Sequence, residues 1–449
     1  MEELYAKYCA CGGRVTTDSR AIRGGEIFFA LRGETFDGND YAFKALEAGA
    51  AWAVVNEDAE IPGQARDDEK KARDDERLIR VPDPLTTLRD LAVWHRTHVR
   101  EGKLPVLGLT GTNGKTTTKN LIAAVLARKY RVTATQGNLN NDIGVPLSLL
   151  SITPETEIAV IEMGANHPDD IAKLVQVSRP DYGLITNVGR AHLLGFGSFE
   201  GVKAAKGELY KWLGSHRGSL IFLNEDDPDL REMAAQQPCH IFGYGLNYQG
   251  AEVLPATPQE PFLRVRLASG ETVRTQLVGA YNATNVLAAL AVGEYFGVKR
   301  ADAIAAVEGF VPSNNRSQMT RTERNTLIVD AYNANPSSMR AALDNFRHVE
   351  AEHKLALLGD MRELGAESLA EHEKVVRQLL EMKLPACLVG EEFKKALETT
   401  SSADPDRRIS WFPTSEALAE HLKAHPVQGS MILIKGSRGI QMEKVLPEL

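Results

Sequence analysis

Residues 106–118 read V-L-G-L-T-G-T-N-G-K-T-T-T, an apolar run followed by glycines, one lysine and three threonines. This order predicts a buried strand, a tight turn and the start of a helix. The N–H groups of such a turn point inward and the helix dipole favours negative charge, so the turn can hold phosphate. Lys115 would reach the terminal phosphates, and the Thr116 hydroxyl would ligate Mg²⁺. The turn consists of Gly111, Thr112, Asn113, Gly114, Lys115, Thr116 and Thr117.

The turn departs from the full G-x-x-x-x-G-K-[ST] pattern at one position, because Leu109 stands where that pattern has its first glycine. The lysine and the hydroxyl still follow the strand at the spacing that phosphate binding needs. The alternative is an ordinary glycine-rich turn between a strand and a helix, without a ligand.

Two further groups follow predicted strands and could act at the same place. Glu162 ends the apolar run 158–161, and His192 ends the segment T-N-V-G-R-A-H after the next strand. The carboxyl ends of parallel strands meet at one edge of a sheet, where ligands bind. We therefore expect both side chains near Thr116, as ligands of Mg²⁺. The alternatives are a helix-capping or ion-paired Glu162 and a His192 that only packs.

Other polar residues have roles that their types and positions leave open. Lysines on helices are usually solvated, and nothing in the sequence selects between Lys203 and Lys206. One loop gathers Asn138, Asn140 and Asn141, which are turn-forming residues and which could also hydrogen-bond a peptide or its carboxylate.

Asn282 precedes an alanine-rich helix predicted over 283–296. It is a natural N-cap, since its short polar side chain can accept a hydrogen bond from the first free N–H groups. Contact with a nucleotide is the alternative, and the residues alone do not separate the two.

Periodicity and turn signals divide the chain into three α/β domains. A small N-terminal domain (1–82) precedes a central P-loop ATPase-like domain (83–311) with a mostly parallel sheet. The C-terminal domain (312–449) has Rossmann-like alternation but no G-x-G-x-x-G after its first strand, which disfavours dinucleotide binding. Strands are predicted at 26–31, 51–55, 104–109, 131–135, 157–163, 182–188, 262–267, 272–278, 327–330, 355–359, 387–390, 409–412 and 431–435, and helices at 41–48, 85–99, 119–129 and 283–296.

Two segments are predicted to lie outside this regular structure. The run 67–77 mixes both charge signs without apolar periodicity, which is typical of a solvated loop or helical insertion. The segment 311–316, V-P-S-N-N-R, is a turn-rich linker between the last two domains.

The bulk composition excludes several classes of protein. The chain has 449 residues, of which 43% are hydrophobic and 25% charged, with a net charge of -8. Nucleic acid as a main partner is disfavoured, because neutralising phosphates needs clustered basic residues. No apolar run is long enough to span a membrane. The four scattered cysteines do not form a disulfide framework, and we expect reduced thiols and a cytoplasmic location.

Several motifs together resemble the Mur ligase family over nearly the whole chain. They are G-T-N-G-K-T-T, E-M-G-A-N-H, A-K-G-E and Y-N-A-T-N-x-x-A-A. D-A-Y-N-A-N-P, N-L-N-N and K-G-S-R are similar to the branch that adds D-alanyl-D-alanine. The branch that adds the third, diamino-acid residue usually carries D-N-P-R, which this sequence lacks.

The resemblance implies an ATP-dependent amide ligase of peptidoglycan precursor synthesis. ATP would phosphorylate the C-terminal carboxylate of UDP-MurNAc-tripeptide, and the amine of D-Ala-D-Ala would attack the acyl phosphate to give UDP-MurNAc-pentapeptide. The resemblance also implies two Mg²⁺ ions, a monomeric protein and closure of a hinge near 311–316. The third residue of the tripeptide, lysine or diaminopimelate, stays undecided.

The resemblance also assigns roles to single residues. Lys115 and the loop would hold the phosphates, Thr116 and Glu162 one Mg²⁺, and Glu162 and His192 a second. Lys206, rather than Lys203, matches the family's carbamylated lysine, an anionic metal ligand. The remaining matches are Asn282 and Asn285 at adenine, Asp330 at ribose, Arg316 at the γ-phosphate, Ser19 and Arg20 at the uridine diphosphate, and Asn138, Asn140, Asn141, Asn333, Asn335, Lys435 and Arg438 at the peptide substrates.

Two other functions compete with this prediction. One is another amide ligase of the same superfamily, either diamino-acid-adding or of the folylpolyglutamate type. The other is a nucleotide-binding P-loop module without ligase activity. A guanine-reading N-K-x-D is absent from the sequence, which disfavours a G-protein.

Overall fold

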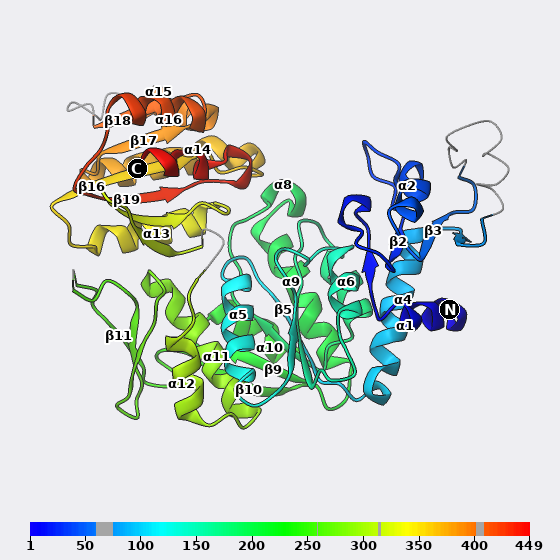
Figure 1. Ribbon diagram of the computed structural model, residues 1–449. Helices are drawn as coiled ribbons and strands as arrows, with labels where there is room; N and C mark the ends of the chain where they lie inside the picture. The colour runs from blue at the N-terminus through cyan, green and yellow to red at the C-terminus, as the bar shows by residue number, and fades with distance from the viewer. Residues whose placement is uncertain (60–74, 258, 313–315, 401–407) are drawn as a thin grey trace.

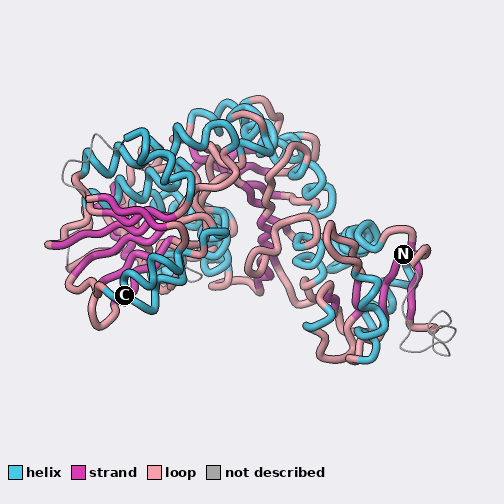
Figure 2. The backbone as a smooth tube through the Cα atoms, turned by 90° about the horizontal axis from the view of Figure 1, so that it is seen from above, coloured by secondary structure: helices cyan, strands magenta, loops and turns pink. Residues whose placement is uncertain are grey.

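The computed structural model describes residues 1–59, 75–257, 259–312, 316–400 and 408–449. It contains three α/β units in chain order: N-terminal at the right of Figure 1, central in the middle and C-terminal at the upper left. Figure 2 shows the N-terminal and C-terminal units on opposite sides of the central one. The predicted α/β class with mostly parallel sheets is confirmed.

The N-terminal unit is built from α1 (Glu2–Ala10), β1 (Val15–Thr16), η1 (Ser19–Ala21), β2 (Ile27–Phe29), η2 (Gly38–Tyr41), α2 (Ala42–Glu47), β3 (Trp52–Asn56) and β4 (Leu78–Val81). Its four strands are parallel in the order β1-β2-β3-β4. The sequence did not predict β1 or β4, because β1 has two residues and β4 has no fully buried side chain. Residues 67–74 of the charged run lie outside the described residues, and Arg77 pairs with Asp75 at 2.7 Å.

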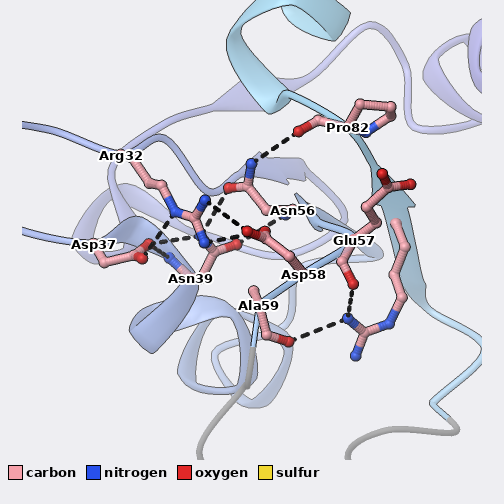
Figure 3. A network of polar contacts seen from close by, with 9 residues as sticks. Arg32, Asp37, Asn39, Asn56, Glu57, Asp58, Ala59 and Pro82 are labelled. Atoms are coloured by element: carbon pink, nitrogen blue, oxygen red, sulfur yellow. Dashed lines mark hydrogen bonds and ion pairs between the residues drawn. The ribbon is translucent and has the colours of Figure 1, made fainter.

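Buried amide side chains join β3 to the loops around it (Figure 3). Asn39 Nδ2 donates to Asn56 Oδ1 at 2.9 Å, and the Asn56 N–H donates back to Asn39 Oδ1 at 3.0 Å. Asn56 Nδ2 donates to the carbonyl of Pro82 at 3.1 Å. Asp37 accepts from the Asn39 N–H and pairs with Arg32, which links the buried pair to the surface.

The central unit is entered by α4 (Pro84–His98) and η3 (Val99–Gly102), and it holds a six-stranded parallel sheet in the order β10-β9-β8-β5-β7-β6. The strands are β5 (Val106–Thr110), β6 (Val132–Ala134), β7 (Ile158–Glu162), β8 (Tyr182–Ile185), β9 (Leu220–Asn224) and β10 (His240–Tyr244). The helices between them are α5 (Lys115–Leu126), α6 (Gly144–Leu150), α7 (Asp170–Ser178), α8 (Leu193–Phe196), α9 (Phe199–Gly214) and α10 (Pro228–Ala235).

Both faces of this sheet are covered, which explains its nearly continuous apolar strands. Leu107 and Leu109 of β5 belong to the core shared with α5, whereas Val106 belongs to the core shared with α4 and α9. Because β5 lies between β7 and β8, the three strands end side by side at one edge.

The rest of the central unit is a small antiparallel sheet followed by two helices. The order β11-β12-β13 confirms the predicted hairpin and adds one strand. The elements are β11 (Glu252–Leu254), β12 (Arg264–Arg266), β13 (Thr272–Arg274), η4 (Ala280–Asn282), α11 (Ala283–Tyr295) and α12 (Arg300–Glu308).

The C-terminal unit contains β14 (Gln318–Arg321), β15 (Thr326–Asp330), α13 (Pro336–His348), β16 (His353–Gly359), η5 (Gly365–Glu367), α14 (Ser368–Met382), β17 (Ala386–Val389), α15 (Glu391–Thr400), β18 (Ile409–Phe412), α16 (Ser415–Ala424), β19 (Ser430–Lys435), η7 (Arg438–Ile440) and η8 (Met442–Glu448). The sheet order is β14-β15-β19-β16-β17-β18, with only the edge strand β14 antiparallel. Among the described residues, no helix is both long and apolar enough to cross a membrane.

The buried amide pair yields a prediction about stability. Asn56→Ala removes the two hydrogen bonds of the Asn56 side chain, and it takes one partner from the Asn39 amide, a residue only 2% exposed. We expect a loss of about 2–3 kcal/mol in the local free energy of opening. Hydrogen exchange followed by mass spectrometry should show faster exchange in β3. The exposed Asn247→Ala is the control, and unchanged protection of β3 in Asn56→Ala would contradict the prediction.

Candidate active site

The glycine-rich loop, residues 111–117, connects β5 to α5 at the carboxyl edge of the central sheet. The helix begins at Lys115, four residues before the predicted start, because Gly114 takes a left-handed conformation (φ 79°) that turns the chain directly into it. Lys115 Nζ donates to the carbonyls of Gly111 and Thr112 at 2.8 and 3.1 Å. The loop carbonyls therefore surround the Lys115 ammonium group, and the free N–H groups of the first turn of α5 lie beside the loop.

Glu162 is the buried carboxylate of the site, with 1% of the residue exposed. Its Oε1 accepts hydrogen bonds from Thr116 Oγ1 at 3.2 Å and from Asn140 Nδ2 at 2.7 Å. Its Oε2 is buried and has no hydrogen-bond partner. An unpartnered anionic oxygen in the interior is costly, so this atom is a candidate ligand position. Neither alternative for Glu162, an ion pair or a helix cap, is seen among its described contacts.

Positive charge surrounds this carboxylate. Burial lowers the pKa of Lys115, the Glu162 carboxylate opposes that shift, and the guanidinium of Arg316 adds to it. The same three influences act on the pKa of Lys119 in the next turn of α5. Three cations from two units thus face one carboxylate, and the excess positive charge favours a polyanion.

Lys206 is buried at the same edge, with 2% of the residue exposed. Its Nζ donates to the carbonyl of Ala165 at 3.2 Å and lies 5.4 Å from the ring centroid of Phe196. Burial, together with repulsion from Lys115, lowers the pKa of Lys206 to about 7. An amine with this pKa is about half neutral at neutral pH, so it is available as a nucleophile.

Lys203, one turn earlier on α9, has a different environment. Its Nζ pairs with Asp229 at 2.8 Å and with Glu232 at 2.5 Å. These hydrogen bonds raise the pKa of Lys203 above its ordinary value, so the amine stays charged. The fold therefore separates two lysines that the sequence alone left equivalent.

His192 faces the C-terminal unit. Its backbone is left-handed (φ 52°), and its Nδ1 is hydrogen-bonded to the carboxylate of Glu363. Burial lowers the pKa of His192, the Glu363 carboxylate opposes the shift, and Lys115 and Lys206 add to it. A neutral imidazole that donates from Nδ1 to a carboxylate keeps the Nε2 lone pair for a metal, as metal-binding histidines commonly do.

The C-terminal unit reaches the loop through the start of α13. Asn335 Nδ2 donates to Asn113 Oδ1 at 2.8 Å, while Asn335 Oδ1 caps the helix by accepting from the Ser338 N–H at 2.9 Å. Nearby, Arg190 pairs with Glu367 at 2.8 Å. These polar contacts bring the two units together at the site.

A second group of C-terminal residues surrounds Tyr332. The Arg316 Cζ lies 3.6 Å from the centroid of the Tyr332 ring, and the Arg438 Cζ lies 5.9 Å from it. Asp330 and Lys435 end β15 and β19 as register partners, and their Oδ2 and Nζ are 2.5 Å apart. The expected ribose and peptide residues thus lie on the same sheet edge as the aromatic ring that contacts Arg316.

The predicted side-chain cap by Asn282 is wrong. Asn282 already has helical dihedral angles, whereas a capping side chain needs an extended backbone to fold back over the first turn. Its Nδ2 instead donates to the carbonyl of Val278 at 2.8 Å. Asn285 donates to Asn282 Oδ1 and accepts from Thr118, and a Cβ on Gly114 would lie 2.8 Å from Asn285 Oδ1. The two asparagines therefore support the back of the loop.

The residues expected at the peptide substrates have mixed environments. Asn140 binds Glu162, whereas Asn141 shapes its own turn by accepting from the Gly144 N–H at 2.9 Å. Asn138 is exposed, as is Asn333, whose side chain accepts from its neighbour's N–H.

Ser19 and Arg20 are not brought to the loop. They lie on η1 in the N-terminal unit, and Arg20 donates to both carboxylate oxygens of Asp18. This pairing lowers the pKa of Asp18 to about 2. The described contacts of Arg20 thus stay within its own unit.

The residues present fit a magnesium ion. No group of three or more His, Cys, Asp or Glu side chains in the described ranges could hold a metal by itself. Mg²⁺ is usually bound by one or two carboxylates together with phosphate oxygens and water, rather than by an all-protein cage. The free Glu162 Oε2 beside the Thr116 hydroxyl meets that requirement.

Sequence reasoning missed three residues that complete this geometry: Asn187, Tyr332 and Glu363. Asn187 and Tyr332 directly follow β8 and β15, so their positions at strand ends were a usable signal. Glu363 lies in an irregular segment before η5, and only the packing of the two units reveals its contact with His192.

Comparison with protein families matches the whole architecture. The models "Mur ligase family, catalytic domain", "Mur ligase middle domain" and "Mur ligase, glutamate ligase domain" match residues 14–95, 109–293 and 315–438. The UDP-N-acetylmuramoyl-tripeptide–D-alanyl-D-alanine ligases of Bacillus subtilis and Treponema pallidum are 33% and 34% identical to this chain. Each alignment covers 97% of this chain, with 92% and 93% of the relatives. This chain belongs to the Mur ligase family.

Solved structures agree with this assignment. A crystal structure of MurF from Acinetobacter baumannii has a TM-score of 0.81 at 30% identity and covers 97% of this chain and 93% of its own. MurF ligase from Thermotoga maritima, solved in complex with ADP, has a TM-score of 0.80 at 26% identity, with coverage of 97% and 96%. The chain is thus a ligase with the three-part fold of these enzymes.

Proposed function

We propose that this ligase joins D-alanyl-D-alanine to the C-terminal carboxylate of UDP-MurNAc-tripeptide and consumes ATP. The γ-phosphoryl group passes to the carboxylate oxygen. The amine of D-Ala-D-Ala then attacks the acyl carbon, the bond to phosphate breaks, and UDP-MurNAc-pentapeptide, ADP and phosphate leave. Relatives named for this reaction align with 97% of the chain, and this supports the assignment.

The observation that carries the proposal is the buried amine of Lys206 beside the glycine-rich loop. A phosphate-binding loop alone is common to many nucleotide-dependent proteins. A lysine with a pKa near 7 on the neighbouring helix can take up CO₂ as a carbamate and become an anion. Such an anion would balance the excess of positive charge around Glu162.

We assign the metal-binding and phosphate-binding roles from the positions of the residues at the site. Thr116 and Glu162 would hold one Mg²⁺, and Glu162, His192 and the Lys206 carbamate a second. The metal would supply charge neutralisation on the phosphoryl oxygens. Lys115 and Arg316 would bind the terminal phosphates from two units, and positioning of this kind dominates phosphoryl transfer.

The other predicted residues are assigned to the remaining parts of the substrates. We assign Asn282 and Asn285 to the adenine side, Asp330 to the ribose and Ser19 and Arg20 to the uridine diphosphate. The peptide substrates would meet the residues Asn138, Asn140, Asn141, Asn333, Asn335, Lys435 and Arg438.

We further propose a cytoplasmic monomer that closes about a hinge near 311–316. Four free thiols, Cys9, Cys11, Cys239 and Cys387, suit a reducing compartment. Residues 313–315 of the hinge segment lie outside the described residues.

A coupled ADP-release assay tests the function. We expect release only when UDP-MurNAc-tripeptide and D-Ala-D-Ala are both present, and tripeptides ending in lysine and in diaminopimelate identify the preferred third residue. Release without an added amine would indicate an ATPase. Release with a UDP-MurNAc-dipeptide and a free diamino acid, or with folate and glutamate, would replace the proposal by another ligase.

Lys206→Ala tests the carbamate. We expect a loss of turnover of roughly a hundredfold or more with ADP affinity largely kept, because the amine acts on the reacting groups. Wild type should give a carbamate signal with ¹³C-bicarbonate in NMR. That signal should fade as pH falls through about 7, since protonation removes the nucleophilic amine. Lys203→Ala, with its surface pairs, is the matched control, and a carbamate signal surviving in Lys206→Ala would exclude this role.

Substitution of Tyr332 tests whether its ring positions the guanidinium of Arg316. Tyr332→Leu removes the ring 3.6 Å from the guanidinium, and we expect kcat to fall about threefold to thirtyfold. Tyr332→Phe should keep most of the rate because the ring remains. ADP lacks a γ-phosphate, so its affinity should not change in either variant. Equal rates in the Leu and Phe variants would refute the role of the ring.

A further inference from the structure

The backbone of Asn113, in the middle of the glycine-rich loop, is held by side chains that follow β8. Asn187 Oδ1 accepts from the Asn113 N–H at 3.0 Å, and Asn187 Nδ2 donates to the Asn113 carbonyl at 3.0 Å. The Thr186 hydroxyl donates to the same carbonyl at 2.6 Å. One amide side chain thus gives the loop the paired hydrogen bonds that an adjacent strand would give.

Further contacts join the loop to the segment after β8 on both sides of the Asn113–Asn187 pair. The Thr112 N–H donates to the Asn187 carbonyl at 3.0 Å, and the Gly189 N–H donates to Thr112 Oγ1 at 2.9 Å. A Cβ on Gly111 would lie 2.0 Å from Thr186 Oγ1, so only glycine fits against the hydroxyl there. Segment 186–189 therefore forms a template along which the first half of the loop lies.

This template decides which loop groups can meet a phosphate. The Asn113 N–H is occupied by Asn187, so the free inward-facing donors belong to the residues after it, at the start of α5. Glycine-rich backbone has many conformations when unsupported, and fixing it in advance removes an entropic cost from binding. The Asn113 side chain stays available to Asn335 of the C-terminal unit.

We propose that Asn187 is a positioning residue for the nucleotide, which fixes the phosphate-binding shape of the loop through the backbone of Asn113. It acts through the loop and does not touch the phosphates. This inference rests on the proposed function, because it takes the glycine-rich loop as the phosphate site. Nucleotide affinity, rather than the chemical step, is the quantity that Asn187 controls.

Calorimetric titration of the full-length protein with ADP and Mg²⁺ tests the inference. Asn187→Ala removes two hydrogen bonds to the loop, and we expect the Kd for ADP to rise on the order of tenfold to a hundredfold. Thr186→Val removes only the hydroxyl donor at nearly the same volume, and we expect a rise of about fivefold.

Asn224→Ala is the matched control. Asn224 ends the neighbouring strand β9, is 7% exposed, and its side chain accepts from the Asp226 N–H without contacting the loop. We expect the Kd for ADP to stay within about twofold of the wild-type value. This comparison separates contact with the loop from removal of any asparagine at the same sheet edge.

Binding stoichiometry and thermal melting separate positioning from folding. If Asn187 had only a structural role, Asn187→Ala would lower the melting temperature or the fraction of folded protein. The binding stoichiometry would fall with the folded fraction, but the folded molecules would keep the wild-type Kd for ADP. That result, or an unchanged Kd in Asn187→Ala, overturns the inference and leaves the proposed function standing. Absence of ADP binding by the wild-type protein would instead overturn both.

Discussion

A carboxylate buried at a sheet edge needs positive partners, and the site is organised around this need. Glu162 is almost completely removed from water, two donors satisfy one of its oxygens, and the other oxygen has none. Burying such a charge is unfavourable unless cations or metal ions compensate it. Lys115, Lys119 and Arg316 compensate it in excess, and the surplus is what a magnesium–nucleotide complex would use.

The parallel sheet brings these groups together. Because β5 lies between β7 and β8, the loop, the carboxylate and the 186–192 segment leave the sheet side by side. This is the kind of edge at which α/β proteins bind ligands. Residues 46 and 74 positions apart in sequence thereby make direct contacts, Thr116 with Glu162 and Asn113 with Asn187.

The sequence predicted many of the elements whose signals are local, although the fully buried strand β9 was not among them. Strand β5, the loop and helix α11 follow from apolar runs, glycines and alanine content, and Glu162 follows from its place after a buried strand. Strands β1 and β14 were missed because they are short or solvent-facing, so they carry no apolar pattern. The distinction between Lys203 and Lys206 depends on burial, and the bond from His192 to Glu363 depends on packing of separate units. Neither the burial of a lysine nor the packing between units produces a local sequence pattern that would predict it.

Two of the contacts that join the C-terminal unit to the site are polar and partly solvated. Arg190 and Glu367 are each about half exposed, at 52% and 45%, and Asn335 meets Asn113 by a single hydrogen bond. Interactions of this kind are each worth about 1 kcal/mol or less, and dissolved ions screen the charged ones. Dissolved ions that screen the pair between Arg190 and Glu367 therefore weaken the packing of the C-terminal unit beside the loop, so ionic strength acts on how the two units meet.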